Sequence, residues 1–518
     1  MHQNISCAGT YSRLEGPRNI YLERARECAA LTIPSLLMEE GHNSDTRLVT
    51  PYQSIGARGV NNLASKLMMA LFPPNTPFFK LSVDDFTLAE LTGGDDTQRA
   101  AVDESLATIE RAVISELEGE GMRNTLHECI RHLIVTGNYL LTLPQEGNLK
   151  GFGLERYVVS RDPQGRLKHV VIKEQFAPDT LDAEVLQLIG HIDSLDQAVS
   201  SEAKVIDVYT KYMIGLNERG KKKWITYQEI NGMQIPGTYG EYDVDTPPIM
   251  ALRWTAVTGE SYGRSHVEEI FGDLRSLEGL HKAILDGSAA SARLLVMVNP
   301  NGTTKKQAVA SAANGSVVTG KASDVEMLQV NKAADLSVAG QTAQRIEQRL
   351  AQAFVMESSV IRQAERVSAE EVRLMATMLE GQLSGTYGAL SSDLQKPLVS
   401  RLMSRMQQQK KLPKLPEGVV KPHIVSGLEA LGRGHDLTKY GQMMQMLAPV
   451  GPEALAMVNV GDLVKRIATS LGIDADGLIK SQEQIEAEQQ QAMEAQMTQM
   501  MAQGGMDMLK AQEQQPQE

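Results

Sequence analysis

Two helical patterns separated by a short β-rich insert, all between Arg264 and Val367, constrain the fold of this 518-residue chain more than any other stretch. The first pattern extends from Arg264 to Leu295 and the second from about Asp335 to Val355. Because the insert is short, we expect the two helices to form an antiparallel pair that carries the insert at one end. A lone pair cannot bury both faces of its helices, so we expect neighbours to cover them.

Apolar residues at helical spacing support both helices. In the second helix they are Ile346, Leu350 and Phe354, at positions i, i+4 and i+8. In the first helix, charged or small residues fill the opposite face, and Pro300 follows the run and closes it. The apolar residues of the first helix are Val267, Ile270, Phe271, Leu274, Leu277, Ile284 and Leu285.

The insert, residues 296–334, is predicted to contain two short β-like runs, Gly315–Thr319 and Val325–Val330, with turn residues around them. Part of it, Gly315–Ala322, comes close to a phosphate-binding loop. That pattern needs Ser or Thr at the position of Ala322, and it needs a helix where this chain has a β-like run. We therefore interpret the segment as a β-turn.

A polar loop, residues 357–367, follows the second helix and leads into a long third helix. Ser368 and Glu371 form a capping box at its start, with Ser at the N-cap and Glu at N3. Pro397 is predicted to kink or break this helix. A Pro-containing linker, residues 411–422, then leads to short helices and to an end rich in Gln, Met and Glu.

Ahead of the pair, a helical part is followed by a β-rich part, which predicts an α+β fold that is mostly helical. Helices are expected at Arg18–Ile33, Ser54–Leu71, Asp95–Glu120 and Asn124–Thr136, and Gly137 gives the last of them a C-cap. The expected strands are Tyr139–Leu143, Arg156–Ser160, Leu167–Lys173, Val205–Tyr212, Lys223–Ile230 and Ile249–Trp254.

Composition narrows the function. A net charge of −13 disfavours tight binding of nucleic acid, which depends on many Lys and Arg contacts to phosphate, but it suits weak contacts that guide DNA. Cys7, Cys28 and Cys129 are too widely spaced for a disulfide framework or a zinc pattern and fit a reducing cytoplasm. No apolar run reaches the roughly 18 residues of a membrane span.

A near match to the helical zinc-protease motif extends from His127 to His132. The second histidine comes one position too late, so on a helix the two rings would diverge by roughly 140°. We therefore expect an ordinary helix here. No catalytic residue, metal site or cofactor is predicted anywhere in the chain.

Four longer stretches are more specific than any of these motifs. They are Thr50–Leu67 (TPYQSIGARGVNNLASKL), Gly259–Ser265 (GESYGRS), Glu365–Glu371 (ERVSAEE) and Ser426–Gly434 (SGLEALGRG). In this order the chain resembles the portal proteins, or head-to-tail connectors, of short-tailed bacteriophages (podoviruses of the autographivirus type). The resemblance extends from about Tyr21 to Ile485.

The resemblance implies a portal fold with wing, stem, clip and C-terminal crown, assembled as a dodecameric ring around a DNA channel. It assigns residues 1–263 to the wing, 264–295 to the first stem helix, 296–334 to the clip, 335–356 to the second stem helix, 357–367 to the channel (tunnel) loop, 368–440 to the long helix and wing, and 441–518 to the crown and a mobile tail.

The implied work is structural and not enzymatic. The ring would be made in the host cytoplasm and stand at the portal vertex of the capsid in the virion. There it would nucleate head assembly, dock the packaging motor, conduct and retain viral double-stranded DNA, and seat the tail for ejection. The implied partners are further copies of the chain, double-stranded DNA, the major capsid and scaffolding proteins, the terminase large subunit, a tail adaptor protein and internal core proteins. The alternatives are a non-viral helical scaffold and a nucleotide-driven motor subunit, against which Ala322 argues.

The resemblance also singles out charged residues. It places Arg362 and Arg366 in the channel loop, so we expect both to contact DNA weakly. Lys305, Lys306 and Lys321 lie in the insert. They either face DNA or an acidic partner, or simply solvate the tip, and the sequence leaves both interpretations open.

Overall fold

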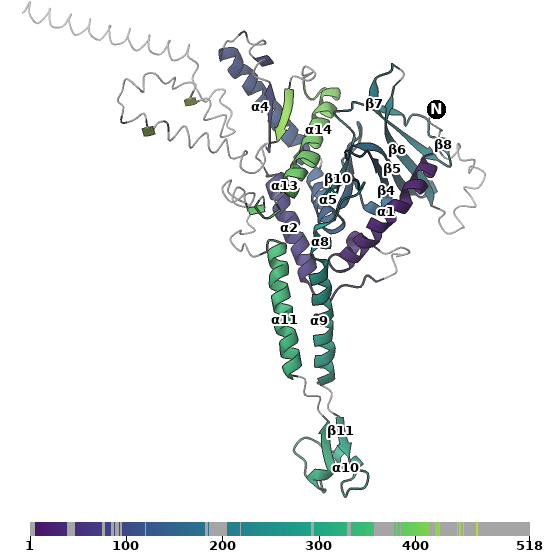
Figure 1. Ribbon diagram of the computed structural model, residues 1–518, viewed down its shortest axis with the longest axis vertical. Coiled ribbons are helices and arrows are strands. Elements are labelled where there is room, and N and C mark those ends of the chain that lie inside the picture. Colours follow the sequence, from purple (N-terminus) through teal and green to yellow (C-terminus); the bar gives the residue numbers. More distant parts are fainter. Residues whose placement is uncertain are drawn as a thin grey trace, which may run out of the picture. The chain divides into compact units, whose positions relative to one another are not determined.

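The computed structural model of the chain is shown in Figure 1. The chain divides into two compact units, one of residues 1–84 and 109–427, the other of residues 85–108 and 428–518. Every element below belongs to the first unit, apart from the first half of helix α4. The structure describes residues 6–38, 47–74, 78–83, 87–88, 93, 96–119, 121–181, 185, 205–217, 219–291, 295–328, 333–356, 378–379, 381–383, 385–413, 420–424, 443, 445–446, 449 and 463–464.

The N-terminal helices are α1 (Cys7–Ala30), α2 (Ile55–Leu71), α4 (Asp96–Gly119) and α5 (Met122–Thr136). The predictions for α2, α4 and α5 are confirmed, including the left-handed Gly137 at the C-cap of α5. Helix α1 begins well before the predicted Arg18. Ser6 caps it through its hydroxyl, and the Glu229 carboxylate accepts from the Cys7 amide at 2.9 Å, so both side chains stabilise its first turn.

Two antiparallel sheets follow α5. The first has the order β4-β5-β6-β7-β8, with β9 also paired to β7, and α1 packs on it through Cys7 and Tyr11 against Val158 and Val171. The second has the order β10-β2-β3. All six predicted strands are present. The bounds are β2 Asn138–Thr142, β3 Lys150–Phe152, β4 Tyr157–Arg161, β5 Leu167–Phe176, β6 Ile206–Leu216, β7 Lys222–Ile230, β8 Met233–Gln234, β9 Gly240–Tyr242 and β10 Ile249–Arg253. Three short 3₁₀ turns lie at Pro34–Leu36, Leu154–Arg156 and Pro178–Thr180.

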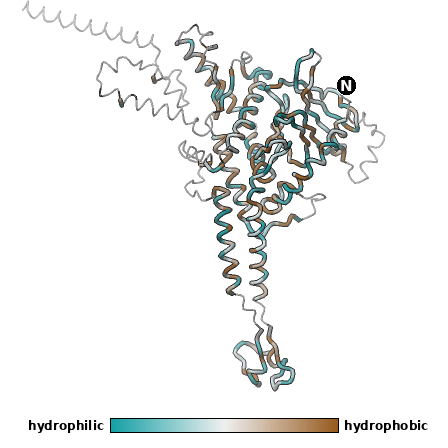
Figure 2. The backbone as a smooth tube through the Cα atoms, viewed as in Figure 1, coloured by the Kyte–Doolittle hydropathy of each residue, from teal (hydrophilic) through white to brown (hydrophobic). Residues whose placement is uncertain are grey.

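The predicted helix pair consists of α9 (Phe271–Ser291) and α11 (Ala333–Ala353), which lie side by side (Figure 1), with the short α8 (His266–Glu269) ahead of them. The continuous first helix predicted to reach Leu295 is wrong at both ends, because the chain breaks at Ile270 and Leu295 already belongs to a strand. Polar contacts connect the two helices: Arg349 forms an ion pair with Asp273 at 2.8 Å, and the His281 ring lies 3.3 Å from the Glu347 carboxylate. Hydrophilic and apolar residues alternate along both helices (Figure 2).

Between the two helices, residues 295–328 form what we call the tip segment. Strands β11 (Leu295–Val298) and β12 (Val325–Leu328) pair antiparallel, with a short helix α10 (Lys306–Ala310) and a 3₁₀ turn (Ala322–Asp324) between them. The predicted strand at Gly315–Thr319 is wrong, since that run is irregular and exposed. The strand that pairs with β12 is instead β11, whose Leu, Val and Met residues are as compatible with a strand as with the end of a helix.

The last described part of the first unit contains α13 (Gly385–Leu390), a π-helical turn (Ser391–Gln395) and α14 (Lys396–Gln408). The predicted break at Pro397 takes the form of this π-helical turn, and Pro397 itself sits in the first turn of α14, where no N–H partner is lost. The predicted linker is partly wrong, because β13 (Val420–Ile424) pairs with β1 (Phe79–Val83). The capping box at Ser368 lies outside the described residues. Within the described part of the chain, no helix is both long and apolar enough to cross a membrane.

The core is centred on α5, whose His132 is 5% exposed and stacks on Tyr139 with 4.7 Å between ring centroids. Burial, and to a smaller degree the charge of Arg131, lowers the pKa of His132 to about 4. The unfolded chain therefore binds a proton at His132 as the pH falls below about 6.5, while the folded protein resists it until near pH 4. Stability linked to His132 is thus present above pH 6.5 and is lost as the pH falls toward 4.

Replacing His132 with Phe keeps a ring against Tyr139 and removes this proton. Between pH 7 and pH 4 the variant should gain on the order of 3 kcal/mol of unfolding free energy relative to the unaltered protein. Urea unfolding at a series of pH values measures this. The matched control is His423→Phe at an exposed site on β13, which should leave the pH profile unchanged. Parallel profiles for the His132 variant and the unaltered protein would contradict the assignment.

Candidate functional site: the base and tip of the helix pair

The base of the helix pair is the segment Gly259–Ser265, which leads from β10 into α8. Thr255 and Arg264 form an antiparallel bridge, and the Ser265 hydroxyl accepts from the Glu268 amide at 2.9 Å as the N-cap of α8. The buried Tyr262 hydroxyl accepts from the Val159 amide on β4 at 3.0 Å. The segment is therefore attached both to the six-stranded sheet and to the start of the helices.

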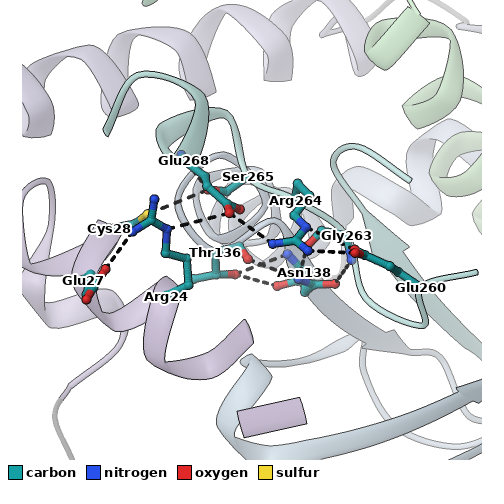
Figure 3. Close-up of polar contacts among 10 residues, drawn as sticks. All are labelled: Arg24, Glu27, Cys28, Thr136, Asn138, Glu260, Gly263, Arg264, Ser265 and Glu268. Atoms are coloured by element: carbon teal, nitrogen blue, oxygen red, sulfur yellow. Dashed lines mark hydrogen bonds and ion pairs between the residues drawn. The ribbon is translucent and has the colours of Figure 1, made fainter. Parts of the chain in front are cut away.

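The side chain of Asn138 on β2 forms two hydrogen bonds with the main chain of Gly263, one as a donor and one as an acceptor. Its Nδ2 donates to the Gly263 carbonyl at 2.9 Å, and its Oδ1 accepts from the Gly263 amide at 2.7 Å (Figure 3). The backbones approach so closely that a Cβ on Gly137 would lie 2.6 Å from the Arg264 carbonyl carbon, and one on Gly263 would lie 2.9 Å from the Gly137 oxygen. Gly137 also has a φ of +74°, so glycine is required at both positions.

Charged side chains surround this contact (Figure 3). The guanidinium of Arg264 binds Glu260 through two hydrogen bonds, at 2.7 and 3.1 Å, and Glu268 at 3.2 Å. The hydrogen bonds from Arg264 lower the pKa of the Glu260 carboxyl, and those to Glu260 raise the pKa of Arg264. Arg264 also lies over the ring of Tyr21, 5.0 Å from its centroid. All three ionised side chains are partly exposed, so we expect the network to orient the base more than to stabilise it.

On α1, Arg24 extends the same network. It pairs with Glu27 at 2.9 Å, approaches Glu268 at 3.7 Å, and lies over the ring of Phe271, 4.3 Å from its centroid. Ser265 approaches the Cys28 thiol at 4.0 Å. Helix α1 thus contacts both α8 and the first residue of α9.

Further along α9, in the direction of the tip, Glu278 binds the turn that precedes α2. Its carboxylate accepts from the Tyr52 amide at 2.9 Å and from the Gln53 amide at 3.2 Å. The Gln53 side chain in turn donates to the Leu31 carbonyl at 2.6 Å. The stretch from Thr50 to Leu67 therefore fixes α9 to the body at a second point.

Asp324 organises the tip segment. Its carboxylate accepts from the amides and hydroxyls of Thr303 and Thr304, at 2.8 to 3.2 Å. Burial opposes the charge, but these hydrogen bonds hold the pKa of Asp324 below its usual value. Thr304 also accepts from the Lys321 amide at 2.9 Å, so the two ends of the irregular loop meet there.

The structure places the predicted tip lysines as follows. Lys305, Lys306 and Lys321 are all exposed, with Lys305 and Lys306 at the start of α10 and Lys321 beside Thr304. Arg362 and Arg366 lie outside the described residues. Sequence reasoning missed Asn138, because nothing in the spacing distinguishes an asparagine after a helix C-cap from an ordinary turn residue.

The near matches to a phosphate-binding loop and to a zinc-protease motif both lack the geometry of those sites. The run Gly315–Ala322 is exposed and leads into a 3₁₀ turn and β12, so no helix N-terminus is present there to bind a phosphate. On α5, His132 is buried and its Nε2 lies 3.8 Å from Glu128. Among the residues that the structure describes, no group of three or more His, Cys, Asp or Glu could hold a metal ion.

Comparison with known proteins gives the chain its relatives. A family model described as bacteriophage head to tail connecting protein matches residues 5–479. The portal protein of Enterobacteria phage T3 is 40% identical over 486 residues, which cover 92% of this chain and 89% of that protein. The portal protein of Escherichia phage T7 is 39% identical, covering 96% and 91%. The portal protein of Pseudomonas phage phiKMV is 30% identical, covering 94% and 96%. A chain from the neck of an empty GTA particle has a TM-score of 0.36 and 12% identity, covering 82% of this chain and 90% of that chain.

Replacing Asn138 with Asp tests the base. A carboxylate there would face the carbonyl oxygens of Gly263 and Thr136 without a donor, so the free energy of unfolding should fall by about 3 kcal/mol. The same change at Asn301, which is exposed on the tip, should have almost no effect and serves as the control. Urea unfolding monitored by circular dichroism measures both, and equal small losses would refute the role of Asn138.

Proposed function

The chain belongs to the family of bacteriophage head-to-tail connecting proteins, the portal proteins of podoviruses, and we propose which of its parts perform the separate tasks of a connector. The chain is a structural protein of the virion that connects head to tail at the capsid vertex. As a member of this family it forms a ring that contacts capsid and tail components.

In this proposal α9 and α11 are the stem and the tip segment is the clip. Residues 357–367 are the channel loop. The two sheets and helices α1, α2, α4 and α5 form the wing together with residues 368–440, and residues 441–518 form the crown and a mobile tail. An antiparallel helix pair that carries a small β hairpin between its helices supports the assignment, because it matches the order that the family resemblance implies.

The single observation that carries the proposal is the exposed apolar surface of the helix pair. Leu285 on α9 and Val338 on α11 are 54% and 64% exposed in the single chain. A ring of antiparallel pairs would bury such residues between neighbouring copies, which couples the fold to assembly. Leu274, another apolar residue of the first helix, cannot play this part because it is already fully buried within one chain.

A dodecamer of this chain would carry a large negative charge, since each copy contributes −13. We propose that the acidic background keeps duplex DNA from adhering to the channel, while rings of Arg362 and Arg366 make weak, repeated contacts to phosphate. The ring would thereby conduct and retain double-stranded DNA without binding it tightly.

The remaining tasks are assigned by position. The exposed Lys305, Lys306 and Lys321 make the tip the part best suited to dock an acidic surface, and we assign to it the terminase large subunit during packaging and the tail adaptor afterwards. The wing would contact the major capsid and scaffolding proteins and nucleate the head, and the crown would face the internal core proteins. All of this is mechanical work, and the proposal includes no cofactor and no catalytic step.

Leu285→Asp tests the ring. Each subunit would place a charge in an apolar contact between helix pairs, so the ring should dissociate while the subunit stays folded. Light scattering and negative-stain images measure the assembly state. The control is Ala283→Asp, because that residue is also exposed but lies roughly 200° around the helix. Rings of unchanged stability in the Leu285 variant would contradict the interface.

Replacing both Arg362 and Arg366 with Ala tests DNA retention. Assembly should be intact, because these residues lie in a polar loop, but a smaller fraction of heads should keep a full-length genome. The difference from unaltered heads should shrink at high salt, as phosphate contacts do. Quantifying full-length DNA in packaged heads at low and high salt gives the answer. Equal retention at low salt would end the proposed role of these arginines and leave the connector function untouched.

A further inference from the structure

The end of α11 closes in an unusual way. The Val355 amide donates to the Gln352 carbonyl at 2.9 Å and the Met356 amide to the Ala351 carbonyl at 2.7 Å, which is the Schellman pattern of a helix C-terminus. That pattern places Val355 at a φ of +55°. Glycine or asparagine usually occupies this position, since a β-branched side chain is strained there. Among the described residues, Val355 is the only β-branched residue with a positive φ.

Three side chains from other elements bind the carbonyls at the end of α11 and just beyond it. His266 of α8 contacts the Ala353 carbonyl at 3.0 Å. Asn62 of α2 donates to the carbonyls of Phe354 and Val355, both at 3.2 Å. Lys66 of α2 donates to the Val355 carbonyl at 2.5 Å. We call His266, Asn62 and Lys66 the carbonyl clasp.

Among the residues of the carbonyl clasp, Lys66 is the one whose burial is energetically unfavourable. It is only 8% exposed, and burial lowers the pKa of its ammonium group. A buried cation at the C-terminal end of a helix is favoured by the helix dipole and by the carbonyls there. Ordinary helix ends have water or a glycine cap for this purpose, so a buried lysine indicates that this end needs to be held.

The side chain of Phe354 restricts the movement of the last turn of α11. Its side chain is fully buried, and its ring lies so close to Gly59 of α2 that a Cβ on that glycine would collide with the ring. The ring of His266 packs edge-on against it, with 5.8 Å between centroids. The last turn of α11 can therefore move only if Phe354 leaves its notch on α2.

We propose that Val355 is a strained joint, held closed by the carbonyl clasp and by the Phe354 notch, whose release changes the direction in which the chain leaves α11. An ordinary helix cap would put glycine at this position and would need no buried lysine. In this proposal, the strain at Val355 favours release and the carbonyl clasp opposes it, so loss of a clasp contact shifts the balance toward the released arrangement. The joint lies immediately before residues 357–367, so the proposed change of direction occurs where that segment begins.

A double-mutant cycle on the assembled protein tests the joint. Hydrogen exchange of the amides at positions 355 and 356 is measured by mass spectrometry in the unaltered protein, in Lys66→Met, in Val355→Gly and in the double variant. Removing Lys66 should release the strain at Val355 and accelerate exchange about tenfold. In the Val355→Gly background no strain is left to release, so the same removal should accelerate exchange less than about threefold.

The controls separate strain from simple packing. Lys168→Met, at an exposed site on β5, should leave exchange at the joint unchanged. If Lys66→Met does not assemble, Asn62→Ala takes its place in the cycle, because it removes one clasp member without uncovering a charge. Equal acceleration with and without the Val355→Gly change would show that the clasp residue only packs, and would overturn the proposal. No acceleration in either background would overturn it as well.

Discussion

The close contact between Asn138 and Gly263 is the interaction on which the helix pair depends. A primary amide that both donates to and accepts from one peptide unit fixes the position and the orientation of that unit. The contact requires glycine at 137 and 263, because any Cβ would collide with the opposing backbone. Since Asn138 opens the central strand of the β10-β2-β3 sheet, a displacement of the base would have to deform that sheet. A helix pair that is anchored in this way can transmit force between its tip and the body.

Several cations in the described part of the chain donate to backbone carbonyl oxygens of distant elements. Arg401 donates to the Leu143 carbonyl at 2.9 Å, Arg161 to those of Ser261 and Ala251, and Lys66 to that of Val355. A carbonyl oxygen accepts such a hydrogen bond without requiring a second buried ion. The arrangement also makes the acceptor a fixed part of the backbone, so each cation ties together elements that are distant in sequence.

Periodicity predicted the elements whose own residues determine them. Helices α2, α4 and α5 and strands β2, β4, β5, β6, β7 and β10 were predicted from spacing and are present, whereas the short strands β3, β8 and β9 were not predicted. It failed where a distant partner decides. The start of α1 depends on Glu229, the pairing of β11 depends on β12, and β13 depends on β1. The stretch Gly259–Ser265 at the base was singled out by the family resemblance. The role of Asn138 depends on a contact with a residue distant in sequence, which local spacing cannot reveal.

The two ends of the helix pair are built on opposite principles. At the base, the positive φ falls on Gly137, a residue type that adopts it without strain, and the backbones meet at glycines. At the end of α11, Val355 occupies a conformation that suits another residue type, and three side chains are needed to keep it there. In the proposed function, the connector holds its shape under load and still lets DNA pass in both directions. A rigid base next to a strained joint lets the chain after α11 change direction while α9 stays fixed, so the two requirements fall on different residues.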